Sequence, residues 1–204
     1  MKKHFIIIVL AVFVPLFAAA QPVSLIGHLS GGYGGFPERK WAFRVDHYIG
    51  AIGADVKFDL NDNWSLLVGM DYQFRYMKDA WVGHYGNSGS SINSVILRGH
   101  YLRLPIRAEY DYKWFYAAAG PYVEKGFGNM PDDYELGICG ANLELGGRIN
   151  LNRQDHLRIG LLTSCGVVIE NKPLNNNDIN SAKKLTMGYM ELNWLLRVGY
   201  EHRF

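Results

Sequence analysis

The amino-acid sequence predicts an all-β fold: eight antiparallel strands, each beside the next in the chain, closed into an up-and-down barrel. The first observation behind this prediction is a series of segments in which apolar and polar residues alternate. Alternation with a period of two is typical of a strand, because successive side chains of a strand point to opposite faces. The second is that short and long connections alternate between these segments, and the third is that no helix-period segment of useful length follows residue 21.

The first four strands are predicted in chain order from this alternation. The first is glycine-rich and covers residues 23–35. The second covers residues 47–60 and carries a charge at every other position from Asp55. The third, residues 64–76, alternates most cleanly, with an oily face opposite a mostly polar one. The fourth ends at residue 110, and its polar face carries arginines and a glutamate.

The remaining four strands follow the same pattern. Residues 114–126 form the fifth, whose Glu124 is expected to point toward the polar face. Residues 139–151 form the sixth, the seventh begins at His156, and the eighth covers residues 187–204. In the eighth strand the alternation is sustained throughout, with one apolar face and one face that carries charges of both signs.

The connections predict which end of the barrel carries the loops. The sequences NDN, DYK and NRQD are short and turn-forming, whereas the other connections are long and polar. If both chain ends lie on one side, every short turn falls on that side and every long loop on the other. Short periplasmic turns and long extracellular loops are typical of outer-membrane barrels. The long connections cover residues 36–46, 77–94, 127–135 and 169–187.

Alternation alone does not say which face is inside, so a secreted lipocalin-type barrel with an apolar interior is the alternative. Two features favour a transmembrane barrel with its apolar face outward. The polar face is rich in arginine matched by acids, which fits a lumen, whereas lysine would be expected on a soluble exterior. Aromatic residues also gather near strand ends, where the girdles of membrane barrels lie. These residues are Tyr48, Trp64, Tyr76, Tyr110, Trp114, Tyr200 and Phe204.

The first segment is expected to be a cleaved secretory signal peptide, residues 1–20. It has a basic head, an apolar run and three alanines that fit an A-x-A cleavage site. A membrane anchor is the alternative, but the apolar run is short for a spanning helix and contains Pro15. We therefore expect one mature domain, a barrel of residues 21–204, that is exported and carries no N-terminal lipid.

Charge and cysteine content exclude several function classes. Two of the 21 basic residues lie in the signal peptide, which leaves 19 bases against 19 acids, and a balanced chain gives no support to a nucleic-acid partner. Cys139 and Cys165 have neither metal-ligand spacing nor a disulfide framework. We expect them to be small membrane-facing residues on neighbouring strands, a few residues out of register. No cofactor and no metal are expected.

Two motifs resemble a known family. In the stretch HYLRLPIRAEYDYKWFYAAAGPYV, a Y-L-x-[IL]-P strand precedes a strand with Gly-Pro-Tyr. This stretch resembles the small outer-membrane β-barrels common in Bacteroidota, often labelled PorT-like and similar to OmpX and OmpA barrels, although Arg103 stands where that family often has an acid. Phe204 resembles the aromatic C-terminal signal read by the barrel assembly machinery. The resemblance implies this fold in the cell outer membrane. The matching residues are Tyr101, Leu102, Leu104, Pro105, Gly120, Pro121 and Tyr122.

The charged residues of the polar face are expected to fill the lumen, because an eight-stranded barrel is just wide enough inside for its own side chains. Eight acids and eight bases fall on this face. Since an unpaired buried ion is costly, we expect a salt-bridged plug, with an ion path or a catalytic acid–base pair as the alternative. Asp55, Lys57, Asp59, Glu201 and Arg203 belong to this set. The predicted network consists of Asp71, Arg75, Arg103, Arg107, Glu109, Glu124, Glu144, Arg148, Arg158, Glu191 and Arg197.

Two prolines predict a local weakness in the barrel wall. Counting from a turn near residues 111–112 places Pro105 opposite about Gly120, beside Pro121 on the next strand. Each proline removes a hydrogen bond from the ladder, and lipid offers no water to replace it. A bulge satisfied from the lumen is one interpretation. A lateral seam at Pro105, Gly120 and Pro121, for a lipid chain or a partner protein, is the other.

A catalytic role has weak support. His28 and Ser30 lie two apart on one strand, as in the His-x-Ser pair of some lipid A deacylases, but they fall on the lumen face without an evident orienting acid or oxyanion hole. His84 with Ser88, Ser90 and Ser91 is less specific still. We therefore expect no catalytic residue.

The function expected from the sequence is that of a non-enzymatic outer-membrane protein with a plugged lumen. It would act in surface or complex interactions, as an accessory subunit of a secretion or assembly complex. A lipid A-modifying enzyme is the alternative, followed by a small channel. The expected partners are lipopolysaccharide and phospholipid, the barrel assembly machinery during insertion and other outer-membrane proteins.

Overall fold

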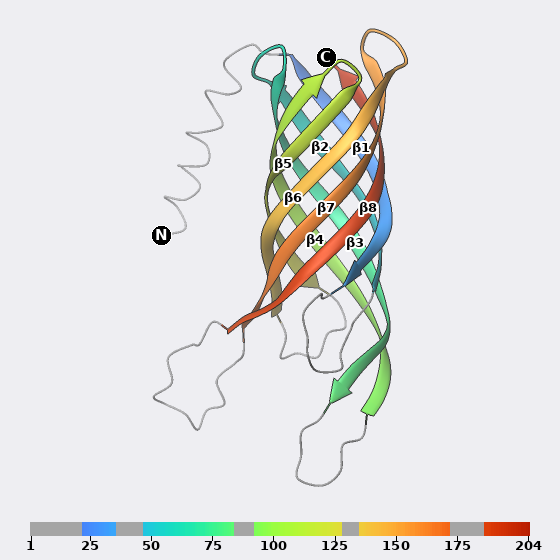
Figure 1. Cartoon of the computed structure of the whole chain (residues 1–204), viewed down its shortest axis with the longest axis vertical. Coiled ribbons are helices and arrows are strands. Elements are labelled where there is room, and N and C mark those ends of the chain that lie inside the picture. The colour runs from blue at the N-terminus through green and yellow to red at the C-terminus, as the bar shows by residue number, and fades with distance from the viewer. Residues whose placement is uncertain (1–21, 36–46, 84–91, 128–134, 172–185) are drawn as a thin grey trace.

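A computed structural model shows a closed barrel of eight antiparallel strands, in which each strand pairs with the next and β8 pairs with β1 (Figure 1). The structure describes residues 22–35, 47–83, 92–127, 135–171 and 186–204. Among them, no helix is long and apolar enough to cross a membrane. The predicted fold class and strand order are confirmed. The strands are β1 Val23–Gly35, β2 His47–Asp59, β3 Trp64–Gly83, β4 Ile92–Tyr112, β5 Phe115–Phe127, β6 Glu135–Asn150, β7 Asp155–Asn171 and β8 Thr186–Arg203.

The start of β1 and the end of β8 lie together at the end of the barrel that carries the short turns (Figure 1). The amide of Phe204 donates to the carbonyl of Val23 over 3.0 Å, which ties the two strand ends. The longer connections leave from the opposite end (Figure 1). The expected arrangement of short turns on one side and long loops on the other is therefore confirmed for the strands described.

Several strands are longer than the alternation predicted. β3 continues to Gly83 instead of stopping near residue 76, and β6 begins at Glu135 instead of residue 139. Of the expected connection of residues 77–94, residues 77–83 and 92–94 belong to β3 and β4, whose ends project beyond the barrel in Figure 1. Backbone pairing continues here beyond the segment in which side-chain polarity alternates, because ladder hydrogen bonds do not depend on side-chain character.

The turn between β4 and β5 also differs from the prediction. DYK was expected to form it, but Tyr112 pairs with Phe115, so the turn consists of Lys113 and Trp114. Lys113 has a positive φ of 56°, a conformation that two-residue hairpins often require. The strand therefore gains Asp111, whose side chain lies with those of the lumen residues.

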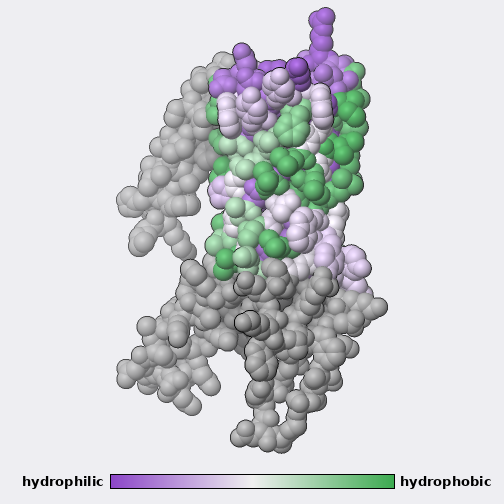
Figure 2. Space-filling model, viewed as in Figure 1, coloured by the Kyte–Doolittle hydropathy of each residue, from purple (hydrophilic) through white to green (hydrophobic). Residues whose placement is uncertain are grey.

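The two faces of the wall differ as predicted. Inward positions are buried and mostly polar or charged, whereas outward positions expose large apolar side chains, such as Leu29 at 61 % and Leu196 at 59 %. Figure 2 shows hydrophobic residues over the middle of the wall and hydrophilic ones at the rim with the short turns. An apolar exterior around a polar interior is the arrangement of a transmembrane barrel, and it excludes the lipocalin-type alternative.

Candidate functional site

The candidate site is the lumen of the barrel, which the charged residues fill as predicted. All eleven residues of the predicted network point inward; ten of them are at least nine-tenths buried and Arg148 is half-buried. Their contacts form three layers along the barrel axis. We call them the periplasmic, middle and extracellular layers, by their distance from the end with the short turns.

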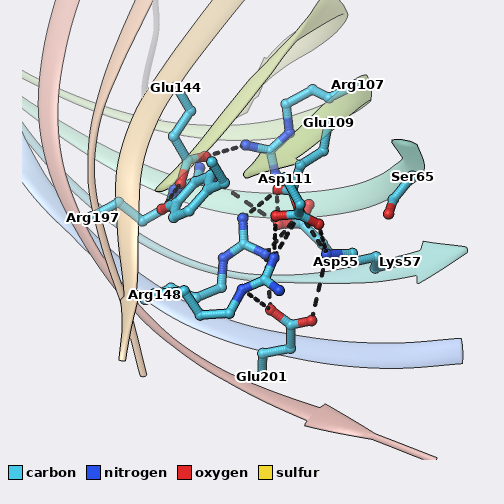
Figure 3. A network of polar contacts seen from close by, with 12 residues as sticks. Asp55, Lys57, Ser65, Arg107, Glu109, Asp111, Glu144, Arg148, Arg197 and Glu201 are labelled. Atoms are coloured by element: carbon cyan, nitrogen blue, oxygen red, sulfur yellow. Dashed lines mark hydrogen bonds and ion pairs between the residues drawn. The ribbon is translucent and has the colours of Figure 1, made fainter. Parts of the chain in front are cut away.

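The periplasmic layer centres on Glu109 of β4. Lys57 donates to Glu109 and to Asp111 over 2.7 Å each. Arg158 contacts Glu109 from the other side and lies 3.0 Å from Glu201. Arg148 pairs with Asp111 (Figure 3). Each carboxylate of this layer therefore has more than one cationic partner, which offsets the cost of burying it.

The middle layer links strands on opposite sides of the barrel. The Arg107 guanidinium lies 2.5 Å from the Asp55 carboxylate and contacts Glu144 (Figure 3). Arg197 of β8 lies 3.2 Å from Glu144 and 3.3 Å from Asp71. These pairs connect β2, β3, β4, β6 and β8 across the lumen, so the side chains close it at this level.

His28 completes the middle layer and tests the catalytic alternative. Its Nε2 atom lies 3.3 Å from both Asp55 and Asp71, so acids do face it, contrary to the sequence-based expectation. Ser30, however, accepts a hydrogen bond from Arg197 over 3.2 Å and makes none with His28. The cavity that His28 lines holds about 10 Å³. That volume suits a single water molecule and leaves no room for a lipid substrate.

The extracellular layer is built around two arginines. Arg75 lies 2.5 Å from Glu124 and 2.9 Å from Glu191, and Arg103 lies 2.8 Å from Glu124. His47 lies 3.2 Å from Glu191. Glu124 therefore bridges the two arginines, because each of its two carboxylate oxygens accepts from a different guanidinium group.

Three inward tyrosines stack on arginines and fill the space that the ion pairs leave. The guanidinium carbon of Arg75 lies 4.1 Å from the ring centre of Tyr101. The guanidinium carbon of Arg103 lies 4.1 Å from the ring centre of Tyr122, and that of Arg158 lies 3.9 Å from the ring centre of Tyr116. Such stacking favours a cation over a ring face and holds the guanidinium groups in one orientation.

Asp111, His28 and His47 belong to the lumen network but are absent from the sequence-based list. Asp111 was assigned to a turn, so extending the alternation by one more step would have found it. His28 and His47 fall on the predicted lumen face, but the list was built from acidic and basic residues, and histidine was counted as neutral. Only closure of the barrel brings those acids near.

The prolines lie in a different register from the one expected. Pro105 pairs with Tyr122, so its predicted position opposite Gly120 is wrong by two residues. The pairing had been counted from a turn near residues 111–112, whereas the turn consists of residues 113–114. The Pro105 side chain is buried toward the lumen, whereas Pro121 faces outward. The prolines therefore lie on opposite faces of the wall.

Pairing of β4 with β5 is interrupted between these prolines. It is regular up to Pro105 and resumes in the same register at Ala108. A Cβ atom added to Gly120 would lie 2.0 Å from the carbonyl oxygen of Ile106, so the close approach of the two backbones requires glycine there. The interruption is local, and a lateral seam at this place stays a prediction.

The cysteines are free and exposed on the outer wall. Cys139 pairs with Val167, and Cys165 pairs with Ala141, so the two are offset by two residues on neighbouring strands, as predicted. The predicted signal peptide and the group of His84, Ser88, Ser90 and Ser91 lie outside the described residues. Among the residues that the structure describes, no group of three or more His, Cys, Asp or Glu side chains could hold a metal ion.

The fold is similar to that of solved outer-membrane barrels. The outer membrane protein OprG from Pseudomonas aeruginosa is 11% identical, with a TM-score of 0.54 over 91% of this chain and 96% of that chain. Outer membrane protein AlkL, solved in DMPC lipid bilayers, is 11% identical with a TM-score of 0.49 over 90% of both chains. Ail, the attachment invasion locus protein of Yersinia pestis, is 10% identical with a TM-score of 0.39 over 89% of this chain and 98% of that one.

Identities this low show a shared fold and nothing finer, and only the OprG score is high enough to support that inference. No protein-family model matches the chain, and no curated protein matches it. The chain therefore has the fold of an eight-stranded outer-membrane barrel.

Proposed function

We propose that this chain is an integral protein of the outer membrane that neither conducts ions steadily nor catalyses a reaction. It acts through its outer wall and its extracellular loops, which engage other molecules. One observation carries the proposal: inward polar and charged side chains from all eight strands pair with one another across the lumen. A barrel closed in this way has its outer surfaces left for contact with partners.

The finer role that we favour is that of an accessory subunit of a secretion or assembly complex. It rests on the resemblance of the Y-L-x-[IL]-P and Gly-Pro-Tyr motifs to PorT-like barrels. The interrupted pairing at Pro105, Gly120 and Pro121 supports a contact at this seam, because unpaired backbone groups in lipid gain most from a neighbouring protein or lipid. Phe204 would serve recognition by the assembly machinery during insertion.

Lipid A modification remains the alternative activity, with Ser30 as its candidate nucleophile. The depth of Ser30 in the lumen and its bond to Arg197 argue against it, since a lipid substrate approaches from outside the wall. A channel is disfavoured by the same ion pairs that fill the lumen.

Conductance in planar bilayers tests the closed lumen. We expect no steady conductance from the folded wild-type chain. A 16-stranded porin with an aqueous channel, reconstituted in parallel, shows that the assay detects inserted barrels. Folding of both is checked by resistance to SDS at room temperature. Steady conductance of the wild type would overturn the proposal.

Extraction from the native membrane in mild detergent tests the partner role. Stoichiometric companions identified by mass spectrometry support a complex subunit. A Pro121→Ala variant asks whether the seam is the contact, with Val123→Ala as the matched control on the same outward face of β5. Recovery of the barrel alone, at every detergent tested, would contradict the accessory role.

A further inference from the structure

Charge is almost absent from the outward-facing positions of the barrel wall. Among the outward-facing strand residues whose side chains the structure describes, acidic and basic side chains occur at two positions only, Asp155 and Lys125. Asp155 lies at the rim with the short turns, 2.7 Å from the Nδ1 atom of His202. Lys125 is exposed, and none of the described residues gives it an acidic partner. Among the strand residues whose side chains are described, the wall therefore presents one cation without an acidic partner.

Lys125 lies at the boundary of the apolar band, on the side of the long loops. It pairs with Leu102, which is eight positions along β4 from Tyr110. Tyr110 and Trp64 form the girdle at the opposite boundary, with ring centres 5.1 Å apart. Eight residues of a strand tilted by about 40° rise roughly 20 Å, close to the height of about 25 Å of the apolar band of such barrels. Lys125 is thus at the depth of lipid headgroups.

A histidine beside Lys125 also faces outward, and its neighbours hold it in place. The His100 ring stacks on Phe127 with ring centres 6.3 Å apart and lies 5.3 Å from Phe74. The Tyr72 hydroxyl lies 2.6 Å from Nδ1 of His100. When the hydroxyl donates this bond, the neutral ring carries its proton on Nε2, which is then a donor without a partner among the described residues.

The strand register brings the two donors together. His100 pairs with Phe127 and Lys125 pairs with Leu102, so His100 and Lys125 are diagonal neighbours on one face. Diagonal neighbours are about 7–8 Å apart, within reach of a long side chain. An ammonium group and an imidazole N–H can therefore reach the same anion, above exposed aromatic rings that offer packing for acyl chains.

We propose that Lys125 and His100 bind a phosphate of a phosphorylated glycolipid, of the lipid A class, in the outer leaflet. The inference rests on the proposed outer-membrane location, which puts the long-loop end of the barrel in that leaflet. Charge complementarity identifies the occupant, because the one unpaired cation of the described wall lies where phosphates of lipids lie. Solvation of Lys125 by the headgroup region would explain the lysine alone, but it does not explain an oriented imidazole donor beside it.

Native mass spectrometry of the full chain tests the site. The barrel is folded in zwitterionic lipid nanodiscs that contain bisphosphorylated lipid A, released into detergent, and scored for the fraction that retains the lipid. Loss of a charged hydrogen bond weakens binding by about tenfold or more, so Lys125→Gln and His100→Gln should each lower retention accordingly. Lys113→Gln is the matched control, because it removes a lysine from the opposite end. It should leave retention unchanged.

Three results would overturn the site: wild-type retention by Lys125→Gln, equal loss in Lys113→Gln, or equal retention of dephosphorylated lipid A. Equal retention of phosphatidylglycerol would also refute the commitment to a glycolipid. Insertion is scored separately by the shift of the folded band in SDS gels. If the barrel inserts but retains no lipid A, the lipid site is contradicted and the proposed function is not. If the barrel fails to insert, the proposed function is contradicted.

Discussion

The lumen face and the lipid face of the same strands follow opposite rules. On β4, the side chains of Arg103, Arg107 and Glu109 are buried, with 0–1 % exposure. Leu104 and Ile106, which lie between Arg103 and Arg107 in the sequence, are each 46 % exposed. The charged face depends on partners, because each ion lost from water needs a counterion nearby. The apolar face depends on its surroundings, because lipid replaces the packed neighbours of a soluble core. A substitution should therefore act differently on the two faces.

The largest effect is expected from removing a cation of the lumen. Arg107→Ala removes the nearest cation of both Asp55 and Glu144 and should cost about 3–5 kcal/mol of unfolding free energy, as breaking buried ion pairs does. Urea unfolding in lipid vesicles, followed by tryptophan fluorescence, measures it. Arg153→Ala, in the exposed turn after β6, is the control and should change little. A cost below about 1 kcal/mol for Arg107→Ala would mean that water reaches the lumen freely.

A charge placed on the lipid face should cost somewhat less, and by an amount that depends on depth. Leu143→Arg, near the middle of the outer wall, is expected to cost about 2–4 kcal/mol. Trp64→Arg, in the girdle, should lose at most about 1 kcal/mol to the new charge, beyond what Trp64→Ala loses. The same vesicle assay compares these variants. Equal charge costs at both depths would contradict the placement of the membrane on this wall.

A smaller effect separates two tyrosines of β5 that look alike in the sequence. Tyr116 donates to Glu144 over 2.7 Å, so Tyr116→Phe should cost about 1.5–3 kcal/mol, as loss of a hydrogen bond to a charged group does. The Tyr122 hydroxyl has no hydrogen-bond partner among the described residues, so Tyr122→Phe should stay within about 0.5 kcal/mol of wild type. Each variant controls for the other. Equal losses would show that the Tyr116 bond to Glu144 contributes nothing of its own.

Much of the fold could be predicted because the period of two reports directly on the two faces of a strand. All eleven predicted lumen residues point inward for that reason. Strand ends were less predictable: β3 and β6 extend beyond the segments in which the alternation was recognised. The predicted pairing of Pro105 was wrong because the turn between β4 and β5 was misplaced. Residue pairs are counted outward from the turn, so an error in its position shifts every pair of the two strands by the same amount.

The partners within the site could not be predicted. The Arg107 pair with Asp55 spans 52 residues of sequence, and the Arg75 hydrogen bond to Glu191 spans 116. Neither separation leaves a mark in local periodicity. Likewise, nothing in the residue types distinguishes Tyr116, which bonds to Glu144, from Tyr122, which does not.

By itself, the sequence determined which side chains share a face, because the pleat of each strand fixes that, and the matched arginines and acids of one face assigned it to the lumen. Only the tertiary structure decided which charge pairs with which, which tyrosine stacks on which arginine, and that Lys125 and His100 stand together on the outer wall. Those contacts join separate strands, and their geometry exists only once the stagger of neighbouring strands is set and the barrel closes.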